Sequence, residues 1–329
     1  MKSTQAAIKR LAVLTSGGDA PGMNAAIRAV VRTAVEEGIN VFGIYGGFEG
    51  LIQGEVMPLS RRSVSNIIQK GGTFLKTSRS ESFRHQAGRK RGAAILQEWD
   101  INHLVVIGGD GSFHGAHALY EEQSINVIGI PGTIDNDIYG TDLTVGYDTA
   151  VHTALDSIDK IRDTAASHDR IFLVEVMGRH AGFIALEVGI CGGAEEILVP
   201  ESDTTMDNLG EMIKIWSRTG KTSSLIVVAE GHKLGSANEI AAKLRENFHV
   251  SCHVCVLGHT QRGGSPTATD RLLASRLGYH AVHALQQGKT DVMVGWSNNH
   301  VTYTPLPDTW GKKKPLDAEL LKIYRILSS

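Results

Sequence analysis

The sequence of 329 residues has little cysteine, no long apolar run and no excess of charge of either sign. Its three cysteines, Cys191, Cys252 and Cys255, are too few for a disulfide framework. No window approaches about 18 consecutive apolar residues, and the polar start over 1–10 lacks the apolar core of a signal peptide. Lys and Arg total 33 and Asp and Glu total 35, which argues against nucleic-acid binding through bulk charge. We therefore expect a cytoplasmic protein with no membrane and no nucleic-acid partner.

The short motifs that mark a metal, redox or nucleotide site are also missing. Cys252 and Cys255 have CxxC spacing, but they lie in an expected strand whose alternation places them on opposite faces, and no second pair exists. Two segments that end like a P-loop, at Lys221 and Lys289, lack the earlier glycine of that motif. The first glycine-rich segment does not have GxGxxG spacing either. Any phosphate chemistry must use a different scheme.

Glycine is abundant, with 37 residues, and apolar runs of strand length alternate with segments of helical spacing. Most of these runs are unbroken Val, Ile and Leu, which is typical of parallel strands buried on both faces. The alternation predicts a doubly wound α/β fold, and at about 150 residues per domain the length predicts two domains. The expected strands are 11–14, 41–45, 103–107, 126–130, 171–176, 197–199, 225–229 and 254–257, and a helix is expected over 21–37.

Glycine-rich loops follow five of these strands. In open α/β sheets, ligands bind outside the carboxyl ends of the strands. Glycine there lets backbone N–H groups approach an anion, and the helix that follows adds positive potential at its N-terminus. Five such loops indicate more than one phosphorylated ligand. The loops are 15–24, 108–112, 131–137, 177–182 and 258–264.

Three aspartates in these loops are candidates for chemistry. Asp110 follows a strand beside glycines and suits Mg²⁺, which prefers carboxylate, water and phosphate oxygens, although a turn aspartate fits the same pattern. Asp135 and Asp137 lie two residues apart, where a carboxylate could accept the proton of a sugar hydroxyl during phosphoryl transfer. They could equally be two turn-forming residues around Asn136.

Arginines in or near the same loops supply the opposing charge. The guanidinium group is the preferred clamp for phosphate and for transition-state charge, although for any single arginine a surface salt bridge is the commoner role. Their position at strand ends favours the phosphate role. They are Arg79, Arg84, Arg170, Arg179 and Arg262.

Taken together, these loops resemble those of bacterial-type ATP-dependent 6-phosphofructokinases. A shared Gly-Gly-Asp-Gly alone would also fit NAD or lipid kinases, but the matching segments span nearly the whole chain in family order. They are 14–28, 71–73, 106–112, 131–137, 174–179 and 257–266. The resemblance implies the phosphofructokinase fold, with two Rossmann-like domains and mainly parallel sheets. It also implies a discontinuous division, with an ATP- and Mg²⁺-binding domain over 1–146 and 261–311 and a sugar-phosphate-binding domain over 147–260 and 312–329.

The resemblance implies transfer of the ATP γ-phosphate to the 1-hydroxyl of D-fructose 6-phosphate, giving fructose 1,6-bisphosphate in glycolysis. Asp135 would be the general base, with Thr133 also catalytic, and Asp137 would support the base and the metal. Asp110 would hold Mg²⁺, while Arg179 and Arg79 would neutralise the transferring phosphoryl group. The ATP site would be lined by Gly18, Arg79, Ser80, Gly109, Asp110, Gly111, Ser112 and Gly115.

The same resemblance implies the sugar site. The residues at the sugar or its reactive end would be Thr133, Ile134, Asp135, Met177, Gly178, Arg179 and Glu230, and those at the 6-phosphate would be Arg170, His259 and Arg262. In this family the residue at Arg170 comes from a neighbouring subunit, so a homotetramer is implied. Pyrophosphate-using relatives carry Asp where this chain has Gly111 and Lys where it has Gly132, so both glycines favour ATP.

The chain departs from the family pattern at several positions. His253 stands where the family has a second cross-subunit arginine for the 6-phosphate, and Phe48 replaces a tyrosine. Histidine is shorter than arginine and carries its charge only at acidic pH. A lost charged hydrogen bond costs about 1.5–3 kcal/mol, or roughly 10- to 150-fold in affinity. We therefore expect His253 to weaken fructose 6-phosphate binding, with recovery at lower pH.

The regulatory site implied by the resemblance is incomplete. Thr219 replaces a lysine, Ser223 a histidine and Asn66 an aspartate, so we expect regulation by ADP and phosphoenolpyruvate to be weak or absent. The residues that match the family's effector pocket are Arg28, Arg32, Arg61, Arg162, Glu195 and Lys221.

Other functions stay open at this point. The donor could be pyrophosphate, and the acceptor could be tagatose 6-phosphate or sedoheptulose 7-phosphate. A non-catalytic module that keeps ATP or sugar-phosphate binding is a different class. The presence of Asp110, Asp135 and Arg179 favours an enzyme over such a module.

Overall fold

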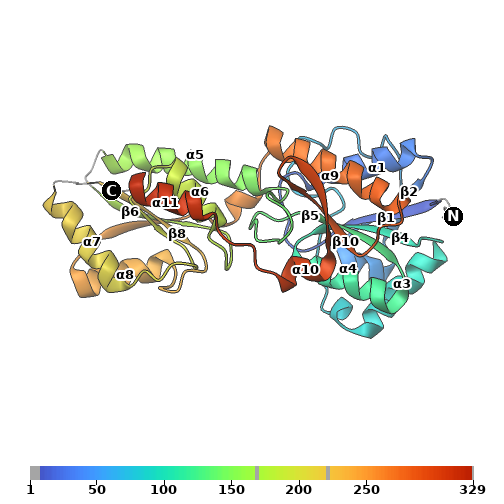
Figure 1. Cartoon of the computed structure of the whole chain (residues 1–329), viewed down its shortest axis with the longest axis horizontal. Coiled ribbons are helices and arrows are strands. Elements are labelled where there is room, and N and C mark those ends of the chain that lie inside the picture. The colour runs from blue at the N-terminus through green and yellow to red at the C-terminus, as the bar shows by residue number, and fades with distance from the viewer. Residues whose placement is uncertain (1–7, 167–169, 220–222, 328–329) are drawn as a thin grey trace. The chain divides into compact units, whose positions relative to one another are not determined.

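Two open sheets organise the computed structural model, which describes residues 8–166, 170–219 and 223–327 (Figure 1). Each sheet is the centre of one compact unit. The first unit contains the chain up to Ile134, Ile138–Thr149 and Arg262–Lys314. The second contains Asp135–Asp137, Ala150–Gln261 and the chain from Pro315 onward.

The first unit is built on a seven-stranded sheet of order β11-β10-β5-β4-β1-β2-β3. Its five central strands are parallel, whereas β3 and β11 pair antiparallel at the two edges. The strands are β1 (Arg10–Thr15), β2 (Asn40–Ile44), β3 (Val56–Leu59), β4 (His103–Gly108), β5 (Asn126–Pro131), β10 (Val292–Ser297) and β11 (His300–Pro305).

Helices cover both faces of this sheet because its central strands are apolar on both faces. Alternate residues such as Leu14 and Val106 join one core, and their neighbours Val13 and Val105 are buried on the other side. Helices α1 and α9 pack together over one face, while α3, α4 and α10 pack over the other (Figure 1). The helices are α1 (Met23–Glu36), α2 (Gly47–Gln53), α3 (Gln86–Glu98), α4 (Asp110–Gln123), α9 (Ala268–Gln286) and α10 (Leu306–Gly311), with a 3-10 turn, η1, at Ser82–Arg84.

The second unit is built on a four-stranded parallel sheet of order β7-β8-β6-β9. Leu173, Ile226 and Val228 face a core formed with α7 and α8, and α5, α6 and α11 lie on the other face (Figure 1). The strands are β6 (Ile171–Val176), β7 (Glu196–Leu198), β8 (Ser224–Ala229) and β9 (Cys252–Val256). The helices are α5 (Tyr147–Ala166), α6 (Phe183–Cys191), α7 (Met206–Arg218), α8 (Ala237–Phe248) and α11 (Ala318–Leu327), with a 3-10 turn, η2, at Gly258–Arg262.

The two units divide within three residues of each expected domain boundary. Boundaries were expected at 146/147, 260/261 and 311/312, and the units divide at Thr149/Ala150, Gln261/Arg262 and Lys314/Pro315. The first division falls within α5. Asp135–Asp137 also group with the second unit, although they were expected in the ATP-binding domain.

All eight expected strands and the expected first helix are present, and the doubly wound α/β class is confirmed. Apolar runs did not predict β3 or the β10–β11 hairpin, which are the antiparallel parts of the first sheet. None of the helices in the described part of the chain is long and apolar enough to cross a membrane.

Candidate active site

The order of strands in the first sheet reverses between β1 and β4, and two glycine-rich loops leave the sheet there. The Ser16 N–H donates to the Ile107 carbonyl at 2.9 Å. A Cβ at Gly108 would lie 2.5 Å from the Ser16 carbonyl oxygen, and Gly17 has φ +86°, so both positions require glycine. Two glycines and the small Ser112 side chain lie at this switch point, which leaves peptide groups accessible and suits a phosphate group.

Helix α4 begins directly at this edge with the predicted nucleotide-loop residues. Asp110 is its first residue, is exposed, and accepts a hydrogen bond from the Gly111 N–H at 2.6 Å. Ser112 is buried beside Gly17 and Gly108. A Cβ at Gly111 would meet nothing within 4 Å, so this glycine faces open space.

The segment that carries Arg79 and Ser80 is tied to the same loops. The Thr77 hydroxyl donates to the Gly17 carbonyl at 2.9 Å, and the Ser80 hydroxyl donates to Glu49 at 2.5 Å. These bonds hold the backbone on either side of Arg79, whose side chain is exposed. The structure therefore brings Arg79 to the loop after β1.

Gly115 lies one turn further along α4, against two stacked rings. The Phe48 and Phe83 ring centroids are 4.1 Å apart, and a Cβ at Gly115 would lie 3.0 Å from Phe48. Packing against this pair accounts for the glycine. The phenylalanine in place of the family tyrosine therefore serves as part of an apolar contact.

The loop after β5 carries the two candidate carboxylates in different surroundings. Asp135 is buried, Asp137 is exposed, and Asn136 between them has φ +55°. The chain therefore turns at Asn136, and of the two carboxylates only Asp135 is withdrawn from solvent. The Thr133 carbonyl just before it accepts a hydrogen bond from the Thr144 hydroxyl at 2.6 Å.

Gly132 is enclosed by the protein itself. A Cβ there would lie 3.1 Å from both Ile107 and Met23. Packing explains the glycine at this position, whereas Gly111, the other glycine used to infer the phosphoryl donor, faces open space.

Arg179, after β6, faces the buried carboxylate within the second unit. Its Nε lies 3.6 Å from Asp135 Oδ2, and nearly half of its side chain is exposed. Arg179 has φ +52° and follows Gly178 at φ +145°. The Arg179 N–H donates to Glu230 at 3.3 Å, and a Cβ at Gly231 would lie 1.9 Å from the Arg179 carbonyl oxygen. The ends of β6 and β8 thus hold Arg179 in an uncommon backbone conformation.

Gln261 supports Met177, the first residue after β6. Gln261 is fully buried, and its Oε1 accepts a hydrogen bond from the Met177 N–H at 2.8 Å. No sequence pattern predicts this role, because none relates two residues that lie so far apart in the chain.

Of the residues expected at the 6-phosphate, two follow β9. His259 is exposed on η2. Arg262 belongs to the first unit, where its guanidinium donates to the Asp19 carbonyl at 3.1 Å and lies against Gly18. The structure therefore brings Arg262 to the glycine loop after β1.

Arg170 and His253 lie at the amino ends of the strands of the second sheet, opposite the carboxyl ends that carry Arg179. Arg170 precedes β6, and His253 pairs with Phe172 near the amino ends of β9 and β6. Six residues of strand separate Arg170 from the carboxyl end, or about 20 Å. Both residues line a cavity of about 520 Å³, together with Lys214. No sequence motif marks Lys214 as a residue of this cavity. One chain therefore does not bring Arg170 and His253 together with Arg179.

The expected effector residues fall into both units. Arg28 and Arg32 lie one turn apart on α1, where burial and then the neighbouring Arg32 charge lower the pKa of Arg28. Arg61 pairs with Glu36. In the second unit Arg162 lies 3.8 Å from Glu195 and lines a cavity of about 350 Å³ with Ser223. Lys221 lies outside the described residues.

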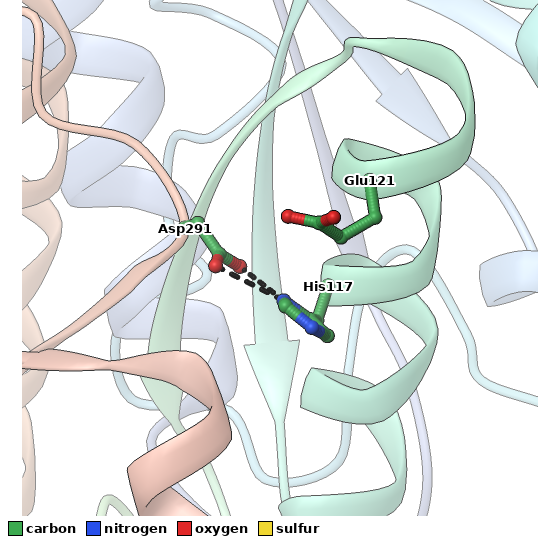
Figure 2. A group of neighbouring side chains, drawn as sticks. All are labelled: His117, Glu121 and Asp291. Atoms are coloured by element: carbon green, nitrogen blue, oxygen red, sulfur yellow. Dashed lines mark hydrogen bonds and ion pairs between the residues drawn. The ribbon is translucent and has the colours of Figure 1, made fainter.

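One cluster of metal-ligating types lies apart from these loops (Figure 2). His117 and Glu121 on α4 face Asp291, which precedes β10, and their ligand atoms lie within 4.8 Å of one another. The His117 ring bonds to both Asp291 oxygens at 2.9 and 3.0 Å. Asp291 stands at the amino end of its strand, away from the loop edge, so this cluster is a His–Asp pair and not the expected Mg²⁺ site.

A buried aspartate of α9 also escaped the sequence analysis. Asp270 is 1% exposed and accepts three hydrogen bonds, from the Gly146 N–H, the Thr149 N–H and the Thr149 hydroxyl. A signal was present, because Thr267 and Asp270 have the spacing of a helix N-cap and its third residue. That spacing could not reveal the partner segment.

Comparison with known proteins identifies the family. The family model described as phosphofructokinase matches residues 10–285. The ATP-dependent 6-phosphofructokinase 1 of Thermus thermophilus is 56% identical over 321 residues, covering 98% of this chain and 100% of the relative. The enzyme of the same general name from Coxiella burnetii is 52% identical over 322 residues, covering 97% and 98%. The solved phosphofructokinase of Saccharomyces cerevisiae is 37% identical with a TM-score of 0.83, covering 96% of this chain and 46% of that longer chain. The chain belongs to the phosphofructokinase family.

Proposed function

We propose that this protein transfers the γ-phosphoryl group of ATP to the 1-hydroxyl of D-fructose 6-phosphate, forming fructose 1,6-bisphosphate and ADP. The full-length similarity to relatives named ATP-dependent 6-phosphofructokinase supports the donor and the acceptor. The observation that carries the proposal is the buried Asp135 carboxylate, 3.6 Å from the half-exposed Arg179 guanidinium, in the loop where the family motif falls.

In this reaction Asp135 accepts the proton of the sugar 1-hydroxyl while the hydroxyl oxygen attacks the γ-phosphorus of ATP and ADP leaves. Burial keeps the carboxylate out of bulk water, and Arg179 stands beside it as a cation for the charge that develops on the transferring group. Thr133 and Ile134 lead the chain into Asp135, and the exposed Asp137 supports the base and the metal.

The first unit binds ATP. The N-terminus of α4 and the glycine loop after β1 supply backbone N–H groups for the phosphates, and Arg79 adds a cation. Gly111 favours ATP over pyrophosphate because it leaves open space at the start of α4, where a side chain would crowd a nucleotide. The remaining proposed contacts are Gly18, Ser80, Gly109, Ser112 and Gly115.

Asp110 fits the Mg²⁺ that such a reaction uses. Its carboxylate is exposed at the start of α4, and its Gly111 contact uses only Oδ1. Mg²⁺ typically takes one or two carboxylates with water and phosphate oxygens, so this donor set is sufficient. When bound, the ion neutralises charge on the ATP phosphates.

The second unit binds the sugar phosphate through Met177, Gly178, Arg179 and Glu230, with His259 at the 6-phosphate. Arg262 of the first unit is also proposed as a 6-phosphate ligand. We further propose a homotetramer in the cytoplasm, in which Arg170 and His253 serve the sugar site of a neighbouring subunit. Their position at the amino ends of the strands supports this. The incomplete effector set, including Thr219, Ser223 and Asn66, supports weak control by ADP or phosphoenolpyruvate.

A coupled assay with Mg²⁺ and fructose 6-phosphate tests the function, with ATP and pyrophosphate compared as donors. We expect turnover with ATP, and we expect Asp135→Asn to lower kcat by about 100- to 10,000-fold. Asp291→Asn is the matched control, because it removes a partly buried carboxylate away from the loops. Turnover with pyrophosphate only, or with tagatose 6-phosphate or sedoheptulose 7-phosphate only, would reassign the donor or the acceptor. An active Asp135→Asn variant would refute the proposed base.

A further inference from the structure

Asp270 is a buried carboxylate to which the proposed reaction assigns no part. It lies in the first turn of α9, and its oxygens accept hydrogen bonds from the Gly146 N–H at 2.7 Å, the Thr149 N–H at 2.8 Å and the Thr149 hydroxyl at 2.5 Å. These donors belong to the start of α5. No cation pairs with Asp270 among the described residues, and burial outweighs the hydrogen bonds that it accepts and raises the pKa of its carboxyl group to about 6.

The contact between the two helix starts is reciprocal. Thr267 is the N-cap of α9, and its hydroxyl donates to Asp148 in the first turn of α5. The Thr267 N–H donates to the Thr149 hydroxyl at 3.0 Å. Each helix start therefore caps the other, and Asp270 is the buried centre of the contact.

The segment that Asp270 holds is bonded in turn to the loop after β5. Directly before Gly146, the Val145 N–H donates to the Pro131 carbonyl at 2.9 Å. The Thr144 hydroxyl donates to the Thr133 carbonyl at 2.6 Å. A two-step path of hydrogen bonds thus runs from Asp270 to the backbone at 131–133, from which the chain enters Asp135 two residues later.

The glycine loop after β1 meets the same segment. A Cβ at Gly146 would lie 2.6 Å from the Ala20 Cβ, and a Cβ at Gly22 would lie 2.7 Å from Val145 and 3.5 Å from the Asp270 Cβ. Both glycines have φ above +100°. The segment that Asp270 holds therefore contacts two loops of the candidate active site, the loop after β1 and the loop after β5.

We propose that Asp270 is a positioning residue for phosphoryl transfer, which fixes the backbone of Thr133 and the entry to Asp135 through Gly146, Thr149, Val145 and Thr144. The inference rests on the proposed function for its catalytic consequence. Asparagine is nearly the same size, but it offers one accepting oxygen where two backbone N–H groups now donate to two oxygens. Asp270→Asn should therefore loosen the segment while keeping the volume of the core.

The first measurement is steady-state kinetics at a temperature where every variant is folded. We expect Asp270→Asn to lower kcat by about 10- to 100-fold, with little change in KM for ATP, because misplacement of a reacting group acts on the chemical step. Asp291→Asn is the matched control for loss of a carboxylate, and its kcat should stay near that of the wild type. A lower melting temperature with an unchanged kcat would show a purely structural role and overturn the proposal.

A double-mutant cycle tests the path itself. Thr144→Val removes the hydroxyl that bonds to the Thr133 carbonyl, which is the second step. Thr309→Val is its matched control, because Thr309 is equally buried and donates to a backbone carbonyl elsewhere. If Asp270 acts through Thr144, the double variant loses no more kcat than Asp270→Asn alone. Losses that multiply would mean independent effects and would contradict the path.

Hydrogen exchange separates this inference from the proposed function. Asp270→Asn should speed amide exchange in peptides that cover 131–137, whether or not the expected substrates are turned over. Faster exchange in a protein without turnover would sustain the positioning and refute the proposed function. Unchanged exchange over 131–137 would overturn the positioning, even in an active enzyme.

Discussion

The backbone around Arg179 fits the role proposed for this residue. A non-glycine residue in the left-handed region costs about 1–3 kcal/mol and persists only where its surroundings require it. Here its backbone N–H is bonded to Glu230, and its carbonyl oxygen lies against Gly231. The strain thus accompanies a guanidinium directed at Asp135. The sequence motif pointed to Arg179, but only the structure shows that Glu230 and Gly231 hold its backbone.

Replacing His253 by arginine should tighten sugar binding. The change restores a permanent cation in the cavity lined by Arg170 and Lys214. A charged hydrogen bond is worth about 1.5–3 kcal/mol, so we expect KM for fructose 6-phosphate to fall about 10- to 150-fold. The initial rate, measured as a function of fructose 6-phosphate concentration, gives this KM for the wild type and the variant. His300→Arg makes the same change on an exposed hairpin and should have no effect, and an unaltered KM in His253→Arg would refute the idea.

Asp270 also predicts a pH dependence of stability. Burial raises its pKa from 3.8 to about 6, with the nearby Asp148 acting in the same direction and the Thr149 and Gly146 hydrogen bonds opposing it. Since the folded-state pKa is the higher one, folding takes up a proton at mildly acidic pH. The stabilisation is complete below about pH 3.8 and is lost as the pH rises through about 6, by about 3 kcal/mol.

Urea unfolding of the wild type and Asp270→Asn across about pH 4.5–7.5 measures this loss. The free energy of unfolding of the wild type should fall relative to that of the variant as the pH rises. Asp100→Asn alters an exposed aspartate, so its difference from the wild type should stay flat. A flat difference for Asp270→Asn as well would contradict the assigned pKa.

The elements show where sequence patterns succeed. Continuous apolar runs predicted all eight expected strands, because parallel strands buried on both faces have no polar side. The missed β10–β11 hairpin has an edge strand with partly exposed residues, so its apolar pattern is weak. Its turn carries Asn298 and Asn299, both with positive φ, a local signal that the analysis did not use.

The same limit applies to the site. Loop residues such as Asp110 and Asp135 were found because their motif is contiguous in sequence. Asp270 and Gln261 were missed because their partners lie more than 80 residues away, and contacts of this kind form only when strand ends converge. Sequence patterns therefore indicated the proposed reacting groups but not the residues that hold them in place.

Gly231→Ala should impair catalysis without unfolding the protein. Its Cβ would lie 1.9 Å from the Arg179 carbonyl oxygen, so the end of β6 must move and take Arg179 with it. We expect kcat to fall about 10- to 100-fold. Circular dichroism checks that the variant is folded, and the coupled assay measures its kcat. Gly311→Ala, where a Cβ meets nothing within 4 Å, should behave like the wild type.

At the scale of the whole molecule, arginines lie at both ends of β6 in the second sheet. Arg179 follows the carboxyl end of β6, whereas Arg170 and His253 stand near its amino end, about 20 Å away. One bound sugar phosphate cannot span that distance. If Arg170 and an Arg179 bind the same sugar phosphate, the two arginines come from different copies of the chain, and each site is then complete only in an oligomer.

This arrangement predicts complementation between inactive variants. Asp135→Asn and Arg170→Ala should each have little activity alone. In hybrids of the two, random assembly of neighbours gives roughly a quarter of the sites both native residues, so activity should return after co-expression. Mixing Asp135→Asn with Arg179→Ala is the matched control, because the Asp135–Arg179 ion pair forms within one chain. Those hybrids should stay inactive in every combination. Recovery in both mixtures, or in neither, would show that Arg170 does not serve a neighbouring site.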